Sequence, residues 1–372
     1  MRRKTILGLG LLISTGSAGC GVVSPTDASV DRRPVAGSEA SADGPRDAAM
    51  ELGAQDRTDR TDGADSTDAT PPTKDAGGDA RRDGGGDALP HDGAADRGRA
   101  ACDPTQPFGT PAPLADFNTT SDDDGLYLSD DLLTAYLSSN RTGGAGGYDL
   151  WVATRGAVGD HFSAPTPLGA VNTPDDERQP VTSHDGLRLY FMTNHATSGT
   201  YDIAVAARGG LTATFASPAP VPGLNGTSND TGPWISLDGT AITFASDRAG
   251  GLGGNDIYVA ALGAAGASGV VNDTAVNSTA DDGAPVLSRD GLTLYFSSKR
   301  AGTGARGNDD IWVARRAVAT DGFAAPTDVG ELNSAAADGP RWLSADSCTL
   351  YFTSDRAGGL GGYDLYQATR GQ

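Results

Sequence analysis

The sequence predicts an all-β fold: a five-bladed β-propeller closed by an N-terminal strand and preceded by a disordered linker. Three observations predict it. A unit of about 54 residues recurs five times within residues 102–372, and repeats of this length built from short strands are typical of propeller blades. Each unit alternates apolar and polar residues with the period of a β-strand. Finally, the phrase expected for the outermost strand is missing after the last unit and stands before the first.

The first 20 residues have the features of a secretory signal. Basic residues at positions 2–4 precede a short apolar run at 6–13, and small residues then lead to Cys20. The apolar run is too short to span a membrane. The segment resembles a bacterial lipoprotein signal, which implies lipidation of Cys20 and membrane contact through a lipid anchor only. Ser17 departs from the aliphatic residue usual in that family, and an ordinary cleaved signal with an incidental cysteine is the alternative.

Residues 21–101 differ sharply in composition from the rest of the chain. They contain no Phe, Trp or Tyr and are rich in Asp, Arg, Ala, Gly, Thr and Pro. Such a segment cannot bury enough apolar surface to offset the entropy lost on ordering. We therefore expect a disordered linker, either a spacer that holds a domain away from a membrane or tolerated low-complexity filler. The formal net charge of the whole chain is −20, which argues against nucleic acid as a partner because phosphate binding requires a basic surface.

Two phrases define each of the five units. The first, as in SRDGLTLYFSSKRAG, places a tight Asp-Gly turn before a strand. The second, as in NDIYVAAL, reads as the next strand, and a glycine-rich loop separates the two. The central Asp residues of the second phrase are spaced 53, 54, 54 and 54 residues apart. The repeated charged residues are Asp149, Asp202, Asp256, Asp310 and Asp364 in the second phrase, and Arg141, Arg248, Arg300 and Arg356 after the first.

The combined phrase S-x-D-G-x-x-L-Y-F-x-S-x-R-x-G-G-x-G-G-x-D-I-W resembles the WD-repeat-like β-propeller repeat of the TolB type over essentially all of 102–372. Departures are local: His195 replaces an Arg, Leu132 replaces a turn Gly, and Ser347 with Cys348 replaces Gly-Leu. The resemblance implies protein–protein contact in the periplasm or at the outer membrane. We expect a monomer, exported across the inner membrane and lipid-anchored in the cell envelope, that acts as a non-enzymatic binding or scaffold module. A glycan-binding lectin or a glycosidase-like propeller enzyme is the alternative.

A loose F-x-x-P phrase marks the fourth strand of a blade. It follows the second phrase in three units, is degraded near Val270, and is absent after the fifth unit; the copies begin at Phe162, Phe215 and Phe323, with an extra one at Phe108. The N-terminal segment can therefore supply the missing strand of the last blade. Closure of this kind removes two exposed sheet edges at once. A larger ring completed by a partner chain is the alternative.

Two cysteines remain if Cys20 is lipidated. Cys102 precedes the closing strand, and Cys348 lies in the turn of the blade that this strand completes. If strands alternate in direction, both fall on the same face of the ring. We expect a disulfide between them, since exported proteins encounter an oxidising compartment; two unrelated thiols are the alternative.

Loops between strands two and three, and between strands four and one, fall on one common face. The repeated Arg and Asp residues there could form a cation or ligand site, but residues that recur in every blade more often hold their own turns. Unrepeated residues are the better candidates for partner binding: Glu177, Arg178, His195 and Arg306, with Trp234 and Trp342 near the opening. The two Trp rings could stack on a sugar or fill the core.

No pattern in the sequence indicates a metal, a cofactor or a catalytic centre. The four His residues lack ligand spacing, and neither a G-x-S-x-G elbow nor a phosphate-binding G-K-[ST] is present. Glu177 is the one unrepeated carboxylate expected in the central funnel, whereas glycosidases need two. We therefore expect no catalytic residues, no metal and no cofactor.

Overall fold

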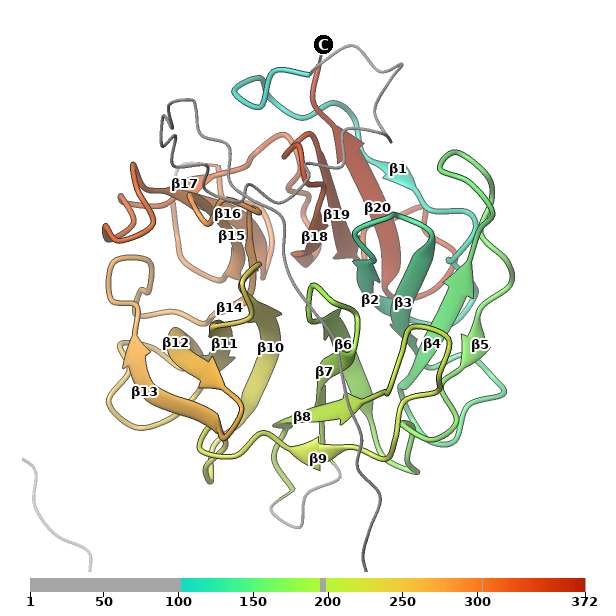
Figure 1. Ribbon diagram of the computed structural model, residues 1–372. Helices are drawn as coiled ribbons and strands as arrows, with labels where there is room; N and C mark the ends of the chain where they lie inside the picture. Colours follow the sequence, from blue (N-terminus) through green and yellow to red (C-terminus); the bar gives the residue numbers. More distant parts are fainter. Residues whose placement is uncertain (1–101, 195–198, 303, 372) are drawn as a thin grey trace, which may run out of the picture. The chain divides into compact units, whose positions relative to one another are not determined.

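The computed structural model describes residues 102–194, 199–302 and 304–371, and they form five four-stranded antiparallel sheets. Figure 1 shows the sheets arranged radially, with one strand of each next to a central axis. Written from inner to outer strand, the blades are β2 (Asp123–Leu128), β3 (Thr134–Ser139), β4 (Asp149–Thr154) and β5 (Thr166–Pro167); β6 (Glu177–Thr182), β7 (Arg188–Thr193), β8 (Asp202–Ala207) and β9 (Ala219–Pro220); β10 (Asp230–Ile235), β11 (Ala241–Ser246), β12 (Asp256–Gly263) and β13 (Gly266–Asn272); β14 (Asp282–Leu287), β15 (Thr293–Ser298), β16 (Asp310–Arg315) and β17 (Thr327–Asp328); β18 (Asp338–Leu343), β19 (Thr349–Ser354), β20 (Asp364–Thr369) and β1 (Ala112–Pro113).

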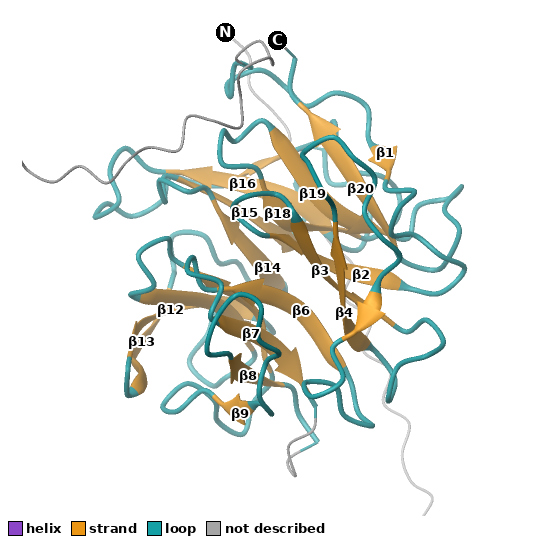
Figure 2. Ribbon diagram, turned by 45° about the vertical axis from the view of Figure 1, so that its right-hand side comes forward, coloured by secondary structure: helices purple, strands orange, loops and turns teal. Residues whose placement is uncertain are grey.

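The five-bladed β-propeller predicted from the repeats is confirmed. Strands and loops make up the whole of the described chain (Figure 2). No helix in these residues is long and apolar enough to cross a membrane. The predicted linker (21–101) and signal (1–20), including Cys20, lie outside the described residues, so these boundaries stay predictions.

Closure by the N-terminal segment is also confirmed. Strand β1 pairs with β20 in antiparallel register, with Ala112 opposite Gln367, and an isolated bridge joins Phe108 to Arg370. The Arg370 guanidinium lies 3.9 Å from the centroid of the Phe108 ring. Because the last blade takes its outer strand from the other end of the domain, neither end of the ring leaves a full sheet edge open.

The predicted disulfide is confirmed as well. Cys102 and Cys348 are bonded, with their Cα atoms 6.2 Å apart, a separation typical of disulfides. The bond ties the start of the closing segment to the turn between β18 and β19. This turn lies on the face of the ring that carries the S-x-D-G turns, which we call the far face. The opposite face, which carries the loops between strands two and three and the loops from one blade to the next, is the mouth face.

Each S-x-D-G turn is held by its own side chains. In the fourth blade the Asp290 carboxylate accepts hydrogen bonds from the Ser288 hydroxyl at 2.5 Å and from the Leu292 backbone N–H at 2.9 Å. The Gly position of the turn has positive φ in every blade, including Leu132 (60°) and Ser347 (59°), the two places where Gly is replaced. The turn is therefore formed even where the residue pays a conformational penalty.

The glycine-rich loops are shaped by close packing against the next blade. A Cβ on Gly251 would lie 1.9 Å from the Asp256 carboxylate, and one on Gly253 would lie 2.2 Å from the Ala280 carbonyl oxygen of the following blade. Side chains would therefore force the blades apart. The third blade differs from the others elsewhere: its outer strand β13 has seven residues, whereas the other four outer strands have two each.

Candidate functional site

The repeated Arg residues link the inner strands of four blades to mouth-face loops. The Arg300 guanidinium donates to the Asp282 carboxylate and the Val276 carbonyl, both at 2.5 Å, and through Nε to the Ser298 hydroxyl at 2.8 Å. Arg141, Arg248 and Arg356 make the same set of bonds, to Asp123, Asp230 and Asp338. These carboxylates are fully buried. Their contacts are those of residues that hold a blade together.

The repeated Asp residues of the third strands hold the glycine-rich loops. Asp364 accepts the backbone N–H groups of Leu360 at 2.8 Å and Gly361 at 3.2 Å. Asp149, Asp256 and Asp310 accept the corresponding N–H groups of their own loops. These repeated Asp residues are therefore structural. Residues that break the fivefold pattern are the better candidates for a binding site.

The second blade replaces the repeated ion pair. Glu177 occupies the position of the buried Asp, and its partner position is His195, which lies outside the described residues. Glu177 is fully buried and accepts hydrogen bonds from the Thr173 backbone N–H (2.9 Å), the Thr173 hydroxyl (2.5 Å) and the Thr193 hydroxyl (3.1 Å). Burial raises the pKa of the Glu177 carboxyl, against the lowering effect of these bonds. Glu177 thus lies inside the blade rather than on the open surface.

An unrepeated ion cluster lies at the mouth-face end of the central channel. The Asp124 carboxylate accepts a bond from Arg178 Nη2 at 2.5 Å and one from Arg341 Nη2 at 2.5 Å. Arg341 Nε also donates to the Asp124 backbone carbonyl at 2.6 Å. Burial favours the neutral form of Asp124, but the charges of Arg341 and Arg178 outweigh it and hold the pKa of Asp124 below its usual range. The cluster joins the inner strands of three blades and carries one net positive charge.

Aromatic rings line the same opening. The Arg178 guanidinium lies 3.9 Å from the centroid of the Tyr148 ring, within the range of a cation–π contact. The Tyr148 hydroxyl donates to Asp122 at 2.8 Å, and the Tyr201 hydroxyl donates to Asp176 at 2.7 Å. Burial raises the pKa of both tyrosines. These contacts place Arg178 between the channel and the half-buried side chains of Tyr148 and Tyr201.

The rim of the opening is acidic. Within the described residues it carries seven carboxylates outside the repeated ion pairs and one lysine, Lys299, which binds Asp281 at 2.9 Å. The seven are Asp122, Asp175, Asp176, Asp247, Asp281, Asp309 and Asp355. Arg306 is also exposed on this face; its side chain reaches the Asn333 carbonyl at 3.4 Å. An acidic rim around a positively charged centre favours a ligand that carries both signs of charge.

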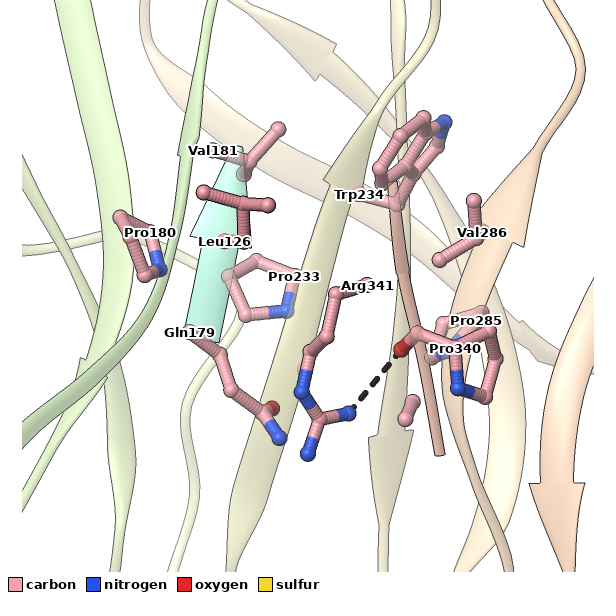
Figure 3. Close-up of a pocket in the computed structure, with 12 residues that line it drawn as sticks. Leu126, Gln179, Pro180, Val181, Pro233, Trp234, Pro285, Val286, Pro340 and Arg341 are labelled. Carbon is pink, nitrogen blue, oxygen red and sulfur yellow. Dashed lines mark hydrogen bonds between the residues drawn. The ribbon is translucent and has the colours of Figure 1, made fainter. Parts of the chain in front are cut away.

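A pocket in the central channel has Arg341 of this cluster among its lining residues (Figure 3). Its cavity volume is about 20 Å³, and it is lined by residues from the inner strands of all five blades. Its walls are mostly apolar, with Gln179 and Arg341 at one end. Trp234 lines this pocket, whereas Trp342 is buried in the core with its ring 5.4 Å from that of Tyr351. Of the two predicted Trp residues, only Trp234 faces the channel.

The structure thus brings Arg178 and Trp234 to the channel, places Arg306 on the rim of the same face, and buries Glu177 and Trp342. The sequence-based reasoning missed Asp124, Gln179 and Arg341. The signal was present: the second residue of the five inner strands is Asp124, Arg178, Thr231, Gly283 and Gly339. Charged residues at two of these five positions cannot serve a repeated structural purpose.

Metal-binding side chains come together at one point of the described ranges. Cys102, Asp346 and Cys348 offer atoms within 4.8 Å of one another. Both thiols belong to the disulfide, so this group is not a metal centre.

The fold and its asymmetric channel define a five-bladed β-propeller. No protein-family model and no curated protein match the chain. Among solved structures it is similar to TolB from Acinetobacter baumannii (19% identity, TM-score 0.40, covering 64% of this chain and 50% of that one). It is also similar to an α-L-arabinofuranosidase from Podospora anserina (14%, 0.40, 73% and 99%) and to a GH43_1 enzyme from Xanthomonas citri (16%, 0.47, 70% and 89%). At these identities the likeness concerns the fold alone.

These matches correct one expectation. The prediction that the chain is not an enzyme is wrong: solved structures similar to this chain include an arabinofuranosidase, a β-xylosidase and a GH43_1 enzyme. A fold shared by binding proteins and glycosidases does not settle which function a member has. The function has to be argued from the site.

Proposed function

We propose that the 102–372 domain is a binding module of the cell envelope that takes a protein partner on its mouth face. The observation that carries this proposal is the Asp124–Arg178–Arg341 cluster. Three blades supply its members, while the equivalent second positions of the other two inner strands hold Thr231 and Gly283, so the ring does not need the cluster. Buried charges at an opening are costly to assemble, and the presence of three of them there supports a recognition role.

The charge of the rim supports a partner with a basic contact surface. Asp247 and Asp355 are exposed on the mouth face, and each carboxylate accepts a backbone N–H of the neighbouring loop, from Asn229 at 2.8 Å and from Ala337 at 2.7 Å. The remaining acceptor capacity faces solvent. Charge complementarity across an interface steers association and weakens as salt rises.

The test compares charge reversal on the two faces of the full chain. Asp247→Lys with Asp355→Lys alters the mouth face; Asp160→Lys with Asp321→Lys makes the same change in far-face loops. Each protein is used to capture partners from envelope extracts at low and high salt. A partner recovered by the wild type and the far-face variant, lost by the mouth-face variant and weakened by salt supports the proposal. A partner lost only by the far-face variant contradicts it.

Glycoside hydrolysis is a second candidate, favoured by a pair of carboxylates near Arg341. Arg341 holds the pKa of Asp124 below its usual range, whereas burial raises the pKa of Asp309, whose carboxyl also feels the Arg341 charge. Environments that move the pKa values of two carboxyl groups in opposite directions are typical of acid–base pairs. Turnover of aryl glycosides by the wild type that is abolished by Asp309→Asn, with an unchanged melting temperature, would establish this activity in place of simple binding.

A further inference from the structure

Gln179 is held in a backbone conformation that its side chain disfavours. Its φ is 53°, in the left-handed region, because the inner strand β6 has a register shift between Arg178 and Val181. The third blade has Gly232 at the equivalent position, with φ 58°. Gly adopts this conformation without penalty, whereas other residues lose stability there. Ala284 of the fourth blade bears the same penalty, with φ 47°, so the left-handed conformation belongs to the register shift of the inner strand. What distinguishes Gln179 is the amide group that it places at this position.

The Gln179 side chain is available to bind a ligand. Within the described part of the chain, its amide makes no hydrogen bond; only its backbone N–H is bonded, to the Ser138 hydroxyl at 3.4 Å. Figure 3 shows the amide at the same end of the channel pocket as the Arg341 guanidinium, with both polar groups pointing the same way. Val181, Trp234 and Val286 lie at the other end of the pocket.

Arg341 has donors to spare at this point. Its guanidinium carries five N–H groups, and three bonds are made within the described residues: to the Asp124 carbonyl, to the Asp124 carboxylate and to the Pro340 carbonyl at 3.0 Å. These bonds fix the guanidinium in place. The unused N–H groups and the Gln179 amide together offer a small, rigid set of donors, one member charged, above an apolar floor.

We infer that Gln179 and Arg341 bind the terminal carboxylate of a polypeptide partner at the opening of the channel pocket. This rests on the proposed function, which places a protein partner on the mouth face, and it names the group that the channel takes. A carboxylate matches a guanidinium and an amide in both charge and geometry. Basic residues preceding the terminus would meet the acidic rim.

The same charges argue against an acidic polysaccharide, the other common source of carboxylates. A chain of uronic acids would bring one negative charge per sugar to a rim that already carries seven carboxylates. The pocket lining, which includes Val181, Trp234, Val286 and four Pro residues, also offers a sugar few hydrogen-bonding groups.

The closing experiment measures binding of three probes to the full chain by titration calorimetry: acetyl-Lys-Lys-Ala-Val with a free carboxylate, the same peptide as its C-terminal amide, and trigalacturonate. We expect the free acid to bind about tenfold or more tightly than the amide, since a charge-assisted hydrogen bond is lost with the carboxylate. Equal affinity for acid and amide, or no binding of the free acid, overturns the inference. Tighter binding of trigalacturonate overturns the polypeptide assignment.

A matched pair of variants separates binding from folding. Gln179→Gly and Ala284→Gly both relieve a left-handed residue, at φ 53° and 47°, in equivalent positions of two inner strands. Both should leave the melting temperature unchanged or raise it by about 2–4 °C. Only Gln179→Gly should weaken binding of the free acid, by about tenfold. Equal affinities in the two variants overturn the role of Gln179.

The outcomes also distinguish this inference from the function on which it rests. If Asp247→Lys with Asp355→Lys weakens binding of acid and amide alike, and Gln179→Gly changes neither, the mouth face remains the partner site and the carboxylate site is overturned. If neither the mouth-face reversal nor Gln179→Gly changes the binding of any peptide, the carboxylate site and the proposed function are both overturned.

Discussion

Replacing Arg300 should lower the free energy of unfolding far more than replacing the neighbouring Lys299. Arg300 is 13% exposed and its partner Asp282 is fully buried, whereas Lys299 and its partner Asp281 are 46% and 37% exposed. Arg300 also lies 5.0 Å and 5.2 Å from the ring centroids of Phe296 and Trp312. Arg300→Met removes these contacts and leaves the Asp282 charge buried without its counter-ion.

The magnitudes follow from the two environments. Breaking a buried ion pair by removing one partner costs about 3–5 kcal/mol, while an exposed pair contributes about 1 kcal/mol or less. The free energy of unfolding of a whole domain is about 5–15 kcal/mol. Arg300→Met should therefore remove a large share of the stability, and Lys299→Met should remove little.

The assay is guanidinium chloride unfolding of the full chain, followed by tryptophan fluorescence. The double variant Arg300→Met with Asp282→Asn completes a thermodynamic cycle and should cost less than the sum of its single variants, because the second change removes the stranded charge. Equal losses for Arg300→Met and Lys299→Met, or strict additivity in the cycle, would refute the assignment of the repeated pair as a structural lock.

Three further predictions concern closure, pH and export. Deleting residues 102–113 from the full chain removes β1 and the Phe108 contacts and should lower the free energy of unfolding by several kcal/mol; an unchanged unfolding midpoint would contradict closure. Asp124→Asn should destabilise the protein at pH 7, and its deficit relative to the wild type should shrink as pH falls below about 3.9, the usual Asp pKa, because the folded-state pKa of Asp124 is lowered. A deficit that is constant down to pH 2 would show that Asp124 titrates normally. Finally, a palmitate analogue should label the wild type and not the Cys20→Ser variant in cells. Equal labelling of both would contradict lipidation of Cys20.

Much of the architecture could be predicted because each blade carries its own local instructions. The S-x-D-G turn, the LYF strand and the glycine-rich loop each require specific residues within a few positions of one another, as the bonds of Asp290 within its own turn show. Repetition five times fixed the number of blades. The displaced F-x-x-P phrase at Phe108 indicated closure, and closure in turn placed Cys102 beside Cys348.

The candidate site could not be predicted in the same way. Asp124 meets Arg178 across 54 residues and Arg341 across 217 residues of chain, and they come together because the ring brings the inner strands of the first, second and fifth blades to one axis. Glu177, chosen from the sequence as a funnel carboxylate, instead takes the buried place of the repeated Asp. The direction in which an inner-strand side chain points depends on a register shift in each inner strand. The sequence by itself determined the blades, because their bonds are local; the tertiary structure alone decided which unrepeated residues share the channel, because that depends on how five blades close around it.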